Sequence, residues 1–211
     1  MDLLLIRHAE PVRIAPGEGG GGPVDPALTE RGRSQAERLA DWLALEPLDA
    51  VLTSPLARAR QTAEPVARAH GLEPEVCADL AEYDVNADHY IPVEELRETR
   101  DHRWTAMIEG RWEDFGGEPP EQFTARIVPC VDGIIGRFAQ RRVALVCHGG
   151  VINVYLAALL GLERHLWFEP AYTSVSRVAA ARSGPRSIVT LNETAHLVGS
   201  RDPDRLARGG L

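Results

Sequence analysis

A short apolar run near the N-terminus, residues 3–6, ends directly in Arg7 and His8. An unbroken run of this length is typical of a strand buried on both faces, as in the parallel sheet of an α/β protein. The carboxyl ends of such strands meet at the crevice where ligands bind. The run therefore predicts that a cation and an imidazole lie together at a functional site. Arginine binds phosphate or carboxylate as a planar fork, and histidine serves as nucleophile, base or metal ligand.

Two further apolar runs, residues 49–53 and 143–147, also end in polar residues and a helix start. Between the runs, the patterning and the turn residues predict helices and short strands in alternation. This alternation indicates an α/β fold, a three-layer α/β/α sandwich around a mostly parallel sheet. Helices are predicted at about 29–45, 54–70, 92–110, 121–140 and 151–160, with Thr29 as an N-cap and Pro55 in a first turn, and further strands at about 73–78, 174–181 and 187–191.

The 211 residues are enough for one domain spanning the whole chain, 1–211. Residues 83–117 are irregular, and we interpret them as a helical insertion that covers the carboxyl edge of the sheet. The loop over residues 10–27 is rich in glycine and proline and directly follows His8, so it is a candidate lid. The polar tail, about 201–211, is expected to be loose.

All 23 basic residues are arginine, because the chain contains no lysine. Schiff-base, pyridoxal-phosphate and phosphate-loop lysine mechanisms are therefore excluded. Any phosphate must be held by arginine, histidine and backbone N–H groups. The net charge of −8 argues against a nucleic-acid partner, although it permits a locally basic pocket.

The three cysteines, Cys77, Cys130 and Cys147, match no metal-binding or disulfide pattern and are expected to be buried free thiols. The apolar N-terminal run is too short for a signal peptide, and no stretch approaches the roughly 18 apolar residues of a membrane span. We therefore expect a cytoplasmic protein without a membrane partner. A homodimer stays open, because oligomeric state is not readable from the chain.

The residues that follow the three strands suit the binding of one anion. If the strand ends meet, His8, Arg58 and His148 converge at one place. Gly149 and Gly150 let the backbone approach a ligand closely. They also open a helix whose free N–H groups favour negative charge. Convergence of these groups predicts a site for an anion.

Six ordered segments, which span nearly the whole chain, resemble the motifs of the histidine phosphatase superfamily with its phosphoglycerate mutase-like fold: residues 5–10, 28–36, 54–63, 80–82, 146–150 and 192–197. Arg-His alone is a weak signal, whereas the ordered set at these separations is highly specific.

The resemblance implies a role for each matching residue. His8 would be the nucleophile that becomes phosphohistidine. Arg7, Arg58 and His148 would bind the phosphoryl oxygens, beside the Gly149 backbone. Glu82 would protonate the leaving oxygen and then deprotonate the attacking water, with Asp84 and Glu10 as alternative carboxylates. The resemblance implies neither a metal nor another cofactor, since the arginines supply the charge.

The chain departs from the family pattern around the nucleophile. Ala9 replaces a common glycine, and Pro11 stands where serine or threonine is frequent. A phosphate-binding asparagine is not recognisable near Arg13 and Ile14, so a fourth phosphate contact is expected from Arg13, the glycine-rich loop or water. The Gly-x-Trp-x-Gly type of segment that usually follows the acid is also missing.

The leading interpretation is a metal-independent phosphatase for a small phosphomonoester or a phosphoprotein. A phosphoglycerate mutase is the first alternative; its intermediate must be retained and reoriented, typically in a more enclosed pocket. A regulatory domain that binds phosphate without turnover is the second alternative. The complete set of matching residues argues against the latter.

Overall fold

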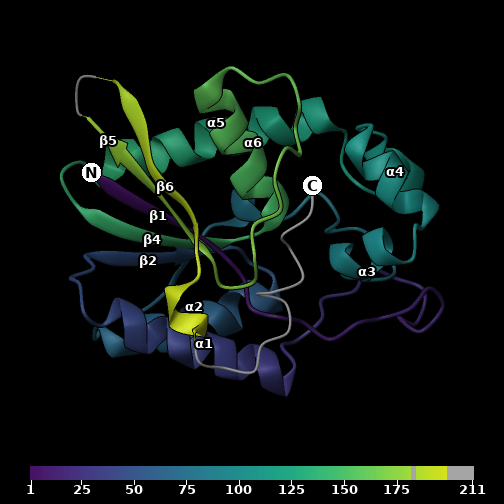
Figure 1. Cartoon of the computed structure of the whole chain (residues 1–211), viewed down its shortest axis with the longest axis horizontal. Coiled ribbons are helices and arrows are strands. Elements are labelled where there is room, and N and C mark those ends of the chain that lie inside the picture. The colour runs from purple at the N-terminus through teal and green to yellow at the C-terminus, as the bar shows by residue number, and fades with distance from the viewer. Residues whose placement is uncertain (182–183, 199–211) are drawn as a thin grey trace.

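The computed structural model describes residues 1–181 and 184–198, in which a six-stranded sheet lies between two sets of helices (Figure 1). The strands are β1 (Asp2–Arg7), β2 (Ala50–Thr53), β3 (Glu75–Val76), β4 (Arg142–Cys147), β5 (Val175–Ala180) and β6 (Arg186–Glu193). Their spatial order is β3-β2-β4-β1-β5-β6; the first four are parallel, and β5 and β6 pair antiparallel at one edge. The predicted α/β class with a mostly parallel sheet is confirmed.

Helices cover both faces of this sheet, so alternate residues of β1 enter two different cores. Leu3 and Leu5 pack with α5 and α6, whereas Leu4 and Ile6 pack with α1 and α2. Burial on both faces explains why β1 is an unbroken apolar run. The helices are α1 (Glu30–Leu43), α2 (Ala57–Ala69), α3 (Val93–Glu98), α4 (His102–Ile108), α5 (Pro120–Arg137) and α6 (Gly149–Leu160), with short 3₁₀ turns η1 (Ala78–Leu80), η2 (Trp112–Phe115) and η3 (Ala195–Leu197).

The sheet places three strand ends side by side. In the parallel register, Arg7 of β1 lies opposite Cys147 of β4, and Thr53 of β2 lies opposite Val146 of β4. Because all three strands run in the same direction, the residues that follow them leave the sheet at the same edge. The strand order, which the sequence does not supply, therefore permits the predicted convergence.

The starts of the first two helices have different caps. Thr29 caps α1 as predicted, and its hydroxyl accepts a hydrogen bond from the Gly32 N–H at 2.9 Å. The expected start of the second helix at Ser54-Pro55 is wrong, because α2 begins at Ala57. The Ala57 N–H donates to the Asp25 carboxylate, with 2.8 Å to the nearer oxygen. Asp25 therefore ties the glycine-rich loop to α2.

The insertion lies beyond the carboxyl ends of the strands, to the right in Figure 1. Its helical part, predicted as one segment, is two helices, α3 and α4. The break falls at Arg100, whose φ is +53°, and at Asp101, whose side chain accepts from the Arg103 N–H at 2.9 Å and caps α4. Trp112 anchors the insertion, because it is fully buried and its indole N–H donates to the Met107 carbonyl.

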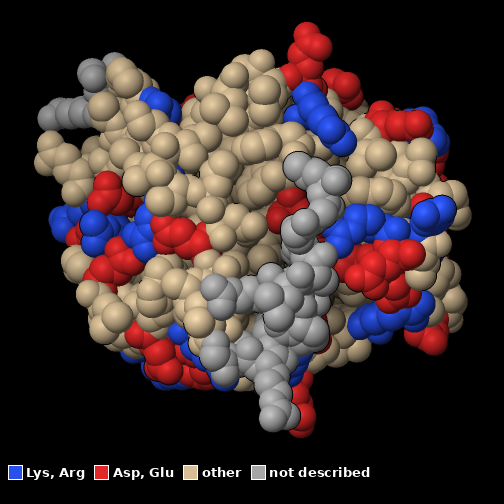
Figure 2. Space-filling view, in the orientation of Figure 1, with Lys and Arg blue, Asp and Glu red and all other residues tan. Residues whose placement is uncertain are grey.

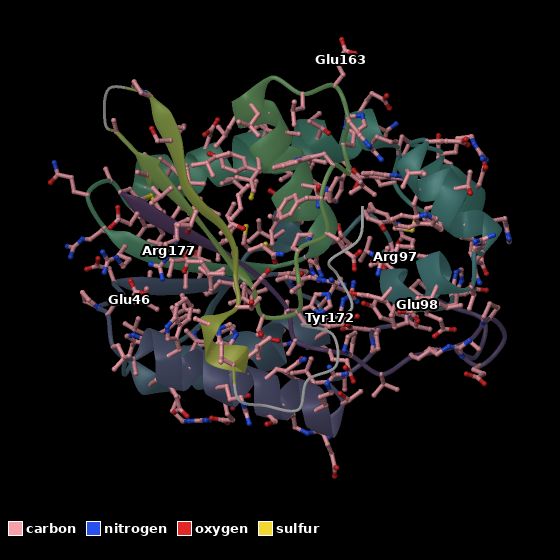
Figure 3. The ribbon with its side chains drawn as sticks, viewed as in Figure 1. Glu46, Arg97, Glu98, Glu163, Tyr172 and Arg177 are labelled. Carbon is pink, nitrogen blue, oxygen red and sulfur yellow. The ribbon has the colours of Figure 1, made fainter. Side chains whose placement is uncertain are left out.

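The surface carries mixed charge. Figure 2 shows acidic and basic side chains interspersed on the face in view. An example is the ion pair of Arg177 with Glu46, which lies to the left in Figure 3, whereas Arg97 and Tyr172 lie further to the right. Within residues 1–181 and 184–198, no helix is long and apolar enough to cross a membrane. The tail predicted at about 201–211 lies outside the described residues.

All three cysteines are free thiols, as predicted, but only Cys147 is buried. Cys77 and Cys130 are partly exposed, and their sulfurs lie 3.5 Å apart between the end of β3 and α5. The two cysteines are 53 residues apart in the sequence, so the sequence pattern does not predict this contact.

Candidate active site

His8 lies at the end of β1 and is only 3% exposed. Its Nδ1 lies 2.7 Å from the Ala9 carbonyl oxygen. Because a carbonyl only accepts hydrogen bonds, Nδ1 carries the ring proton and Nε2 keeps its lone pair. Burial, together with the charges of Arg58 and Arg7, holds the pKa of His8 well below its ordinary value. His8 is therefore neutral near pH 7, with a nucleophilic Nε2.

Arg7 is held rigidly beside this ring. One of its terminal nitrogens, Nη1, donates to the Glu94 carboxylate at 2.9 Å and to the Pro170 carbonyl at 2.6 Å. Its guanidinium carbon lies 4.1 Å from the centre of the Tyr172 ring, close enough for a cation–π contact. Both hydrogen bonds are made by Nη1, and together with the Tyr172 ring they fix the plane of the guanidinium.

Arg58 reaches the same place from the first turn of α2, after β2. It is 2% exposed, and its Nη2 donates to Asp84 at 3.1 Å. The Tyr90 ring centre lies 4.8 Å from its guanidinium carbon. An ion pair and an aromatic ring therefore position Arg58 in the same manner as Arg7.

His148 follows β4 and is fully buried, and its ring centre lies 5.1 Å from that of His8. Its Nε2 lies 2.7 Å from the Ser54 hydroxyl oxygen. That oxygen also accepts from the Leu56 N–H at 3.3 Å, so the hydroxyl proton can be donated to Nε2. In this arrangement Nδ1 of His148 carries the ring proton. Burial, followed by the charge of Arg58, holds the pKa of His148 well below its ordinary value.

Glu82 lies two residues beyond η1 and is 6% exposed. Its two carboxyl oxygens accept from the N–H groups of Gly150, at 2.8 Å, and of Tyr83, at 3.2 Å. Burial and the negative charge of Asp84 raise the pKa of Glu82 to about 7 from 4.5. A Cβ atom on Gly150 would collide with this carboxyl group, so the close approach requires glycine.

Three buried nitrogen atoms of these residues have no hydrogen-bond partner: Nε of Arg7, Nε of Arg58 and Nδ1 of His148. A buried donor without a partner costs about 1–3 kcal/mol, so native proteins seldom leave several together. The three atoms come from the ends of three adjacent strands. Their arrangement is that of a preformed site for an anion with several oxygen atoms.

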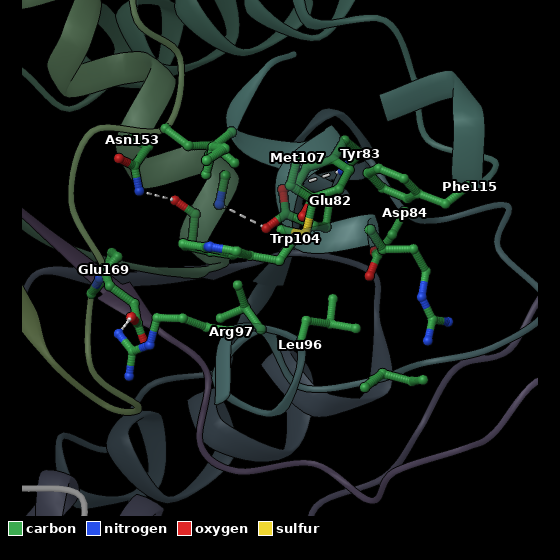
Figure 4. A pocket seen from close by; sticks show the side chains of 18 of the residues that line it. Glu82, Tyr83, Asp84, Leu96, Arg97, Trp104, Met107, Phe115, Asn153 and Glu169 are labelled. Atoms are coloured by element: carbon green, nitrogen blue, oxygen red, sulfur yellow. Dashed lines mark hydrogen bonds and ion pairs between the residues drawn. The ribbon is translucent and has the colours of Figure 1, made fainter. Parts of the chain in front are cut away.

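A cavity of about 360 Å³ opens above these groups, a size that suits a small molecule (Figure 4). The sheet end contributes Arg7, His8, Arg58 and Glu82, and the first turn of α6 contributes Gly149. The insertion and residues 164–170 supply the rest of the lining. The insertion therefore covers the site, as expected.

The structure brings together all the predicted site residues, namely Arg7, His8, Arg58, Glu82, His148 and Gly149. Asp84, one of the alternative carboxylates, also lines the cavity. Asp84 pairs with Arg58, whereas Glu10 pairs with Arg31 away from the cavity. Arg13 pairs with Glu95 and does not line the cavity. In this structure Arg13 therefore lies apart from the groups around His8.

The glycine-rich loop is not the lid that its composition predicts, because residues 10–28 contribute nothing to the lining of this cavity. Instead the loop supports the insertion. The Val24 N–H donates to the Ala87 carbonyl, and Ile14 forms a β-bridge with Tyr90. Tyr90 in turn lies against Arg58.

Sequence reasoning missed the residues that position the arginines, namely Glu94, Tyr90 and Tyr172. None of them belongs to a recognised motif, and Glu94 lies in the first turn of α3, so no local signal distinguishes them. Of the other five histidines only His89 lines this cavity, where it pairs with Asp88. In the part of the chain that the structure describes, no three His, Cys, Asp or Glu side chains form a metal-binding group.

The family model described as "Histidine phosphatase superfamily (branch 1)" matches residues 3–194. Phosphoserine phosphatase 1 of Hydrogenobacter thermophilus is 30% identical over 198 residues, 92% of this chain and 93% of that protein. A probable phosphoglycerate mutase of Yersinia enterocolitica is 29% identical and covers 78% of this chain and 77% of its own.

Among solved structures, a phosphoserine phosphatase of Entamoeba histolytica superposes with a TM-score of 0.74 at 22% identity, and covers 93% of this chain and 99% of its own. The fold and the site thus define an α/β protein built to bind an anion beside a histidine. The chain belongs to the histidine phosphatase superfamily. The family predicted from the motifs is confirmed, and with it the class of enzyme.

Proposed function

We propose that this protein hydrolyses phosphomonoesters through a phosphohistidine intermediate on His8. The observation that carries the proposal is the set of three unpartnered donors around a neutral histidine, with a carboxyl group of raised pKa nearby. Phosphoryl transfer depends mainly on positioning and charge stabilisation, and two fixed arginines supply both.

In the first step, Nε of Arg7, Nε of Arg58 and Nδ1–H of His148 bind the phosphoryl oxygens. The lone pair on Nε2 of His8 forms the P–N bond as the P–O bond to the alcohol breaks. Glu82 gives its proton to the leaving oxygen, so a neutral alcohol departs.

In the second step, water enters the position of the alcohol. Glu82, now a carboxylate, takes one proton from the water as its oxygen forms a bond to phosphorus. The P–N bond breaks, which returns the electron pair to His8 and releases inorganic phosphate. A pKa of about 7 suits Glu82 for both tasks, because the acid and base forms are each accessible near neutral pH.

A phosphoglycerate mutase would use the same first step. The similarity to the Yersinia protein, a probable phosphoglycerate mutase, supports mutase activity as the second candidate function. The two reactions differ in the acceptor, which is water in a phosphatase and a substrate hydroxyl in a mutase. Assays of 3-phosphoglycerate with and without a bisphosphoglycerate primer separate them. Primer-dependent isomerisation that outpaces phosphate release would replace hydrolysis as the function.

The test of the nucleophile compares His8→Ala with His102→Ala, a control whose imidazole is 90% exposed. With an aryl phosphate, we expect His8→Ala to lose more than about 99% of turnover and the control to keep it. Quenched reactions with labelled substrate should yield acid-labile, base-stable phosphate on the wild type and none on His8→Ala. Label on serine, or persistent turnover by His8→Ala, would refute the mechanism.

The proposed mechanism also needs no metal ion, because arginine and histidine provide the charge. Dialysis against a chelator should leave kcat unchanged. Loss of activity that added metal restores would contradict this part of the proposal.

A further inference from the structure

Beyond the phosphate end, the cavity has a predominantly apolar and aromatic wall. One side comes from the insertion and the facing side from the segment after α6, and the wall includes Leu96, Trp104, Met107, Phe115, Trp167 and Phe168. Figure 4 shows Leu96, Trp104, Met107 and Phe115 around the same opening as Glu82. The leaving alcohol of a bound phosphomonoester would face this wall, because Glu82, its proposed proton donor, lines the same cavity as the apolar residues of the insertion.

The polar side chains along this wall are already engaged within the protein. Arg97 forms an ion pair with Glu169, and Arg103 forms one with Asp101. The remaining arginine of the wall, Arg164, is exposed to solvent. A carboxylate on the substrate would have to pair with Arg164 in water, where an ion pair contributes little. Otherwise it would have to displace one of these partly buried ion pairs or lie against apolar carbon, and either is unfavourable.

Asn153 also lines the cavity, but its amide is saturated. Its nitrogen donates to the carbonyls of Gly149 and Phe168, at 2.9 and 3.0 Å. Its oxygen accepts from the N–H groups of Trp167 and Phe168, at 2.9 and 3.1 Å. The three bonds to Trp167 and Phe168 fasten the aromatic segment to α6, so the apolar wall exists before a ligand binds.

We infer that the substrate is a phosphomonoester whose alcohol carries a bulky apolar group, alkyl or aryl, rather than a small charged alcohol such as serine or glycerate. The inference rests on the proposed function, since it assumes that the phosphate end binds a phosphomonoester. It departs from the substrate named for the Hydrogenobacter relative, which is a phosphoserine phosphatase.

A series of alkyl phosphates tests the inference. Ethyl, butyl and hexyl phosphate have leaving alcohols of similar acidity, so differences in kcat/KM report contacts with the wall. Each methylene removed from water is worth up to about fourfold, so kcat/KM should rise roughly tenfold or more from ethyl to hexyl. Phosphoserine and 6-phosphonooxyhexanoate should be poorer than hexyl phosphate by about tenfold or more.

A flat alkyl series, or a preference for either carboxylate-bearing ester, would overturn the inference while leaving the proposed function intact. Failure of the proposed function is distinct: the wild type would hydrolyse none of the esters, or His8→Ala would hydrolyse them equally well.

Trp104→Ala tests the wall itself. We expect kcat/KM for hexyl phosphate to fall toward that for ethyl phosphate, and to fall by a much larger factor than the ethyl value. Ile108→Ser is the second variant, since Ile108 is 36% exposed and tolerates replacement. Leu45→Ala, at a residue 84% exposed outside the cavity, is the matched control. Equal loss on both esters in folded variants, or no change in either, would contradict an apolar alcohol subsite.

Discussion

Replacement of Glu82 by glutamine is expected to make the protein more stable and less active, with a pH dependence that identifies the cause. Glu82 is nearly buried, and burial with the charge of Asp84 raises its pKa to about 7 from 4.5. The folded protein therefore keeps a proton on Glu82 at pH values where the unfolded chain has lost it. Below the unfolded pKa of 4.5, Glu82 is protonated in both states and does not lower the free energy of unfolding. The free energy of unfolding falls as pH rises from there through the folded pKa of about 7.

The magnitude follows from the same two values. At 1.36 kcal/mol per pH unit, ionised Glu82 lowers the free energy of unfolding by about 3 kcal/mol above pH 8. At about pH 5 the cost is under about 1 kcal/mol, because that pH lies only slightly above the unfolded pKa of 4.5. Glutamine is neutral, and its carbonyl oxygen can still accept from the Gly150 N–H. Glu82→Gln should thus gain stability mainly at alkaline pH.

Urea denaturation at about pH 5 and about pH 8.5 measures this difference, and Glu98→Gln, at an exposed position of α3, is the matched control. In the same protein, kcat for alkyl phosphates should fall by about 10²–10⁴. A nitrophenyl ester, whose leaving group needs no proton, should still give a burst of product before slow turnover. An equal stability gain at both pH values, or a loss at the higher one, would refute the reasoning.

Two further substitutions examine the groups that position the site. Gly150→Ala places a Cβ against the Glu82 carboxyl group, so kcat for alkyl phosphates should fall more than about tenfold while circular dichroism stays unchanged; full activity would contradict the close approach. Ser54→Ala removes the partner of His148 Nε2, so the inhibition constant for inorganic phosphate should rise about tenfold and stability should fall by about 1 kcal/mol; an unchanged inhibition constant would exclude this positioning role.

Much of the fold was predictable because its signals are local. The run before Arg7 is apolar on both faces, which only a covered strand tolerates, and Thr29 stands where a helix start needs an acceptor. The predicted start of α2 was wrong because the contact that fixes this start is not local. Its cap is Asp25, which lies 32 residues earlier in the chain, and no local pattern reports such a contact.

The insertion was also predicted only in part. Its helical content was predictable, but its division at Arg100 and Asp101 was not, because helical spacing continues across the break. The composition of the glycine-rich loop suggested a lid, whereas the loop lies behind the insertion and supports Tyr90. Flexible composition does not specify which surface a loop covers.

The sequence by itself determined the chemical groups of this protein: which residues follow which strands, the absence of lysine, and the set of histidines, arginines and carboxylate that we propose to bind and transfer phosphate. These properties reside in residue identity and short spacing. The tertiary structure alone decided the state of each group. The tautomer of His8, the raised pKa of Glu82, the pairing of Arg7 with Glu94 and the apolar wall all arise from burial and contacts between segments far apart in the chain. Desolvation and hydrogen bonding depend on three-dimensional neighbours, which a linear pattern does not contain.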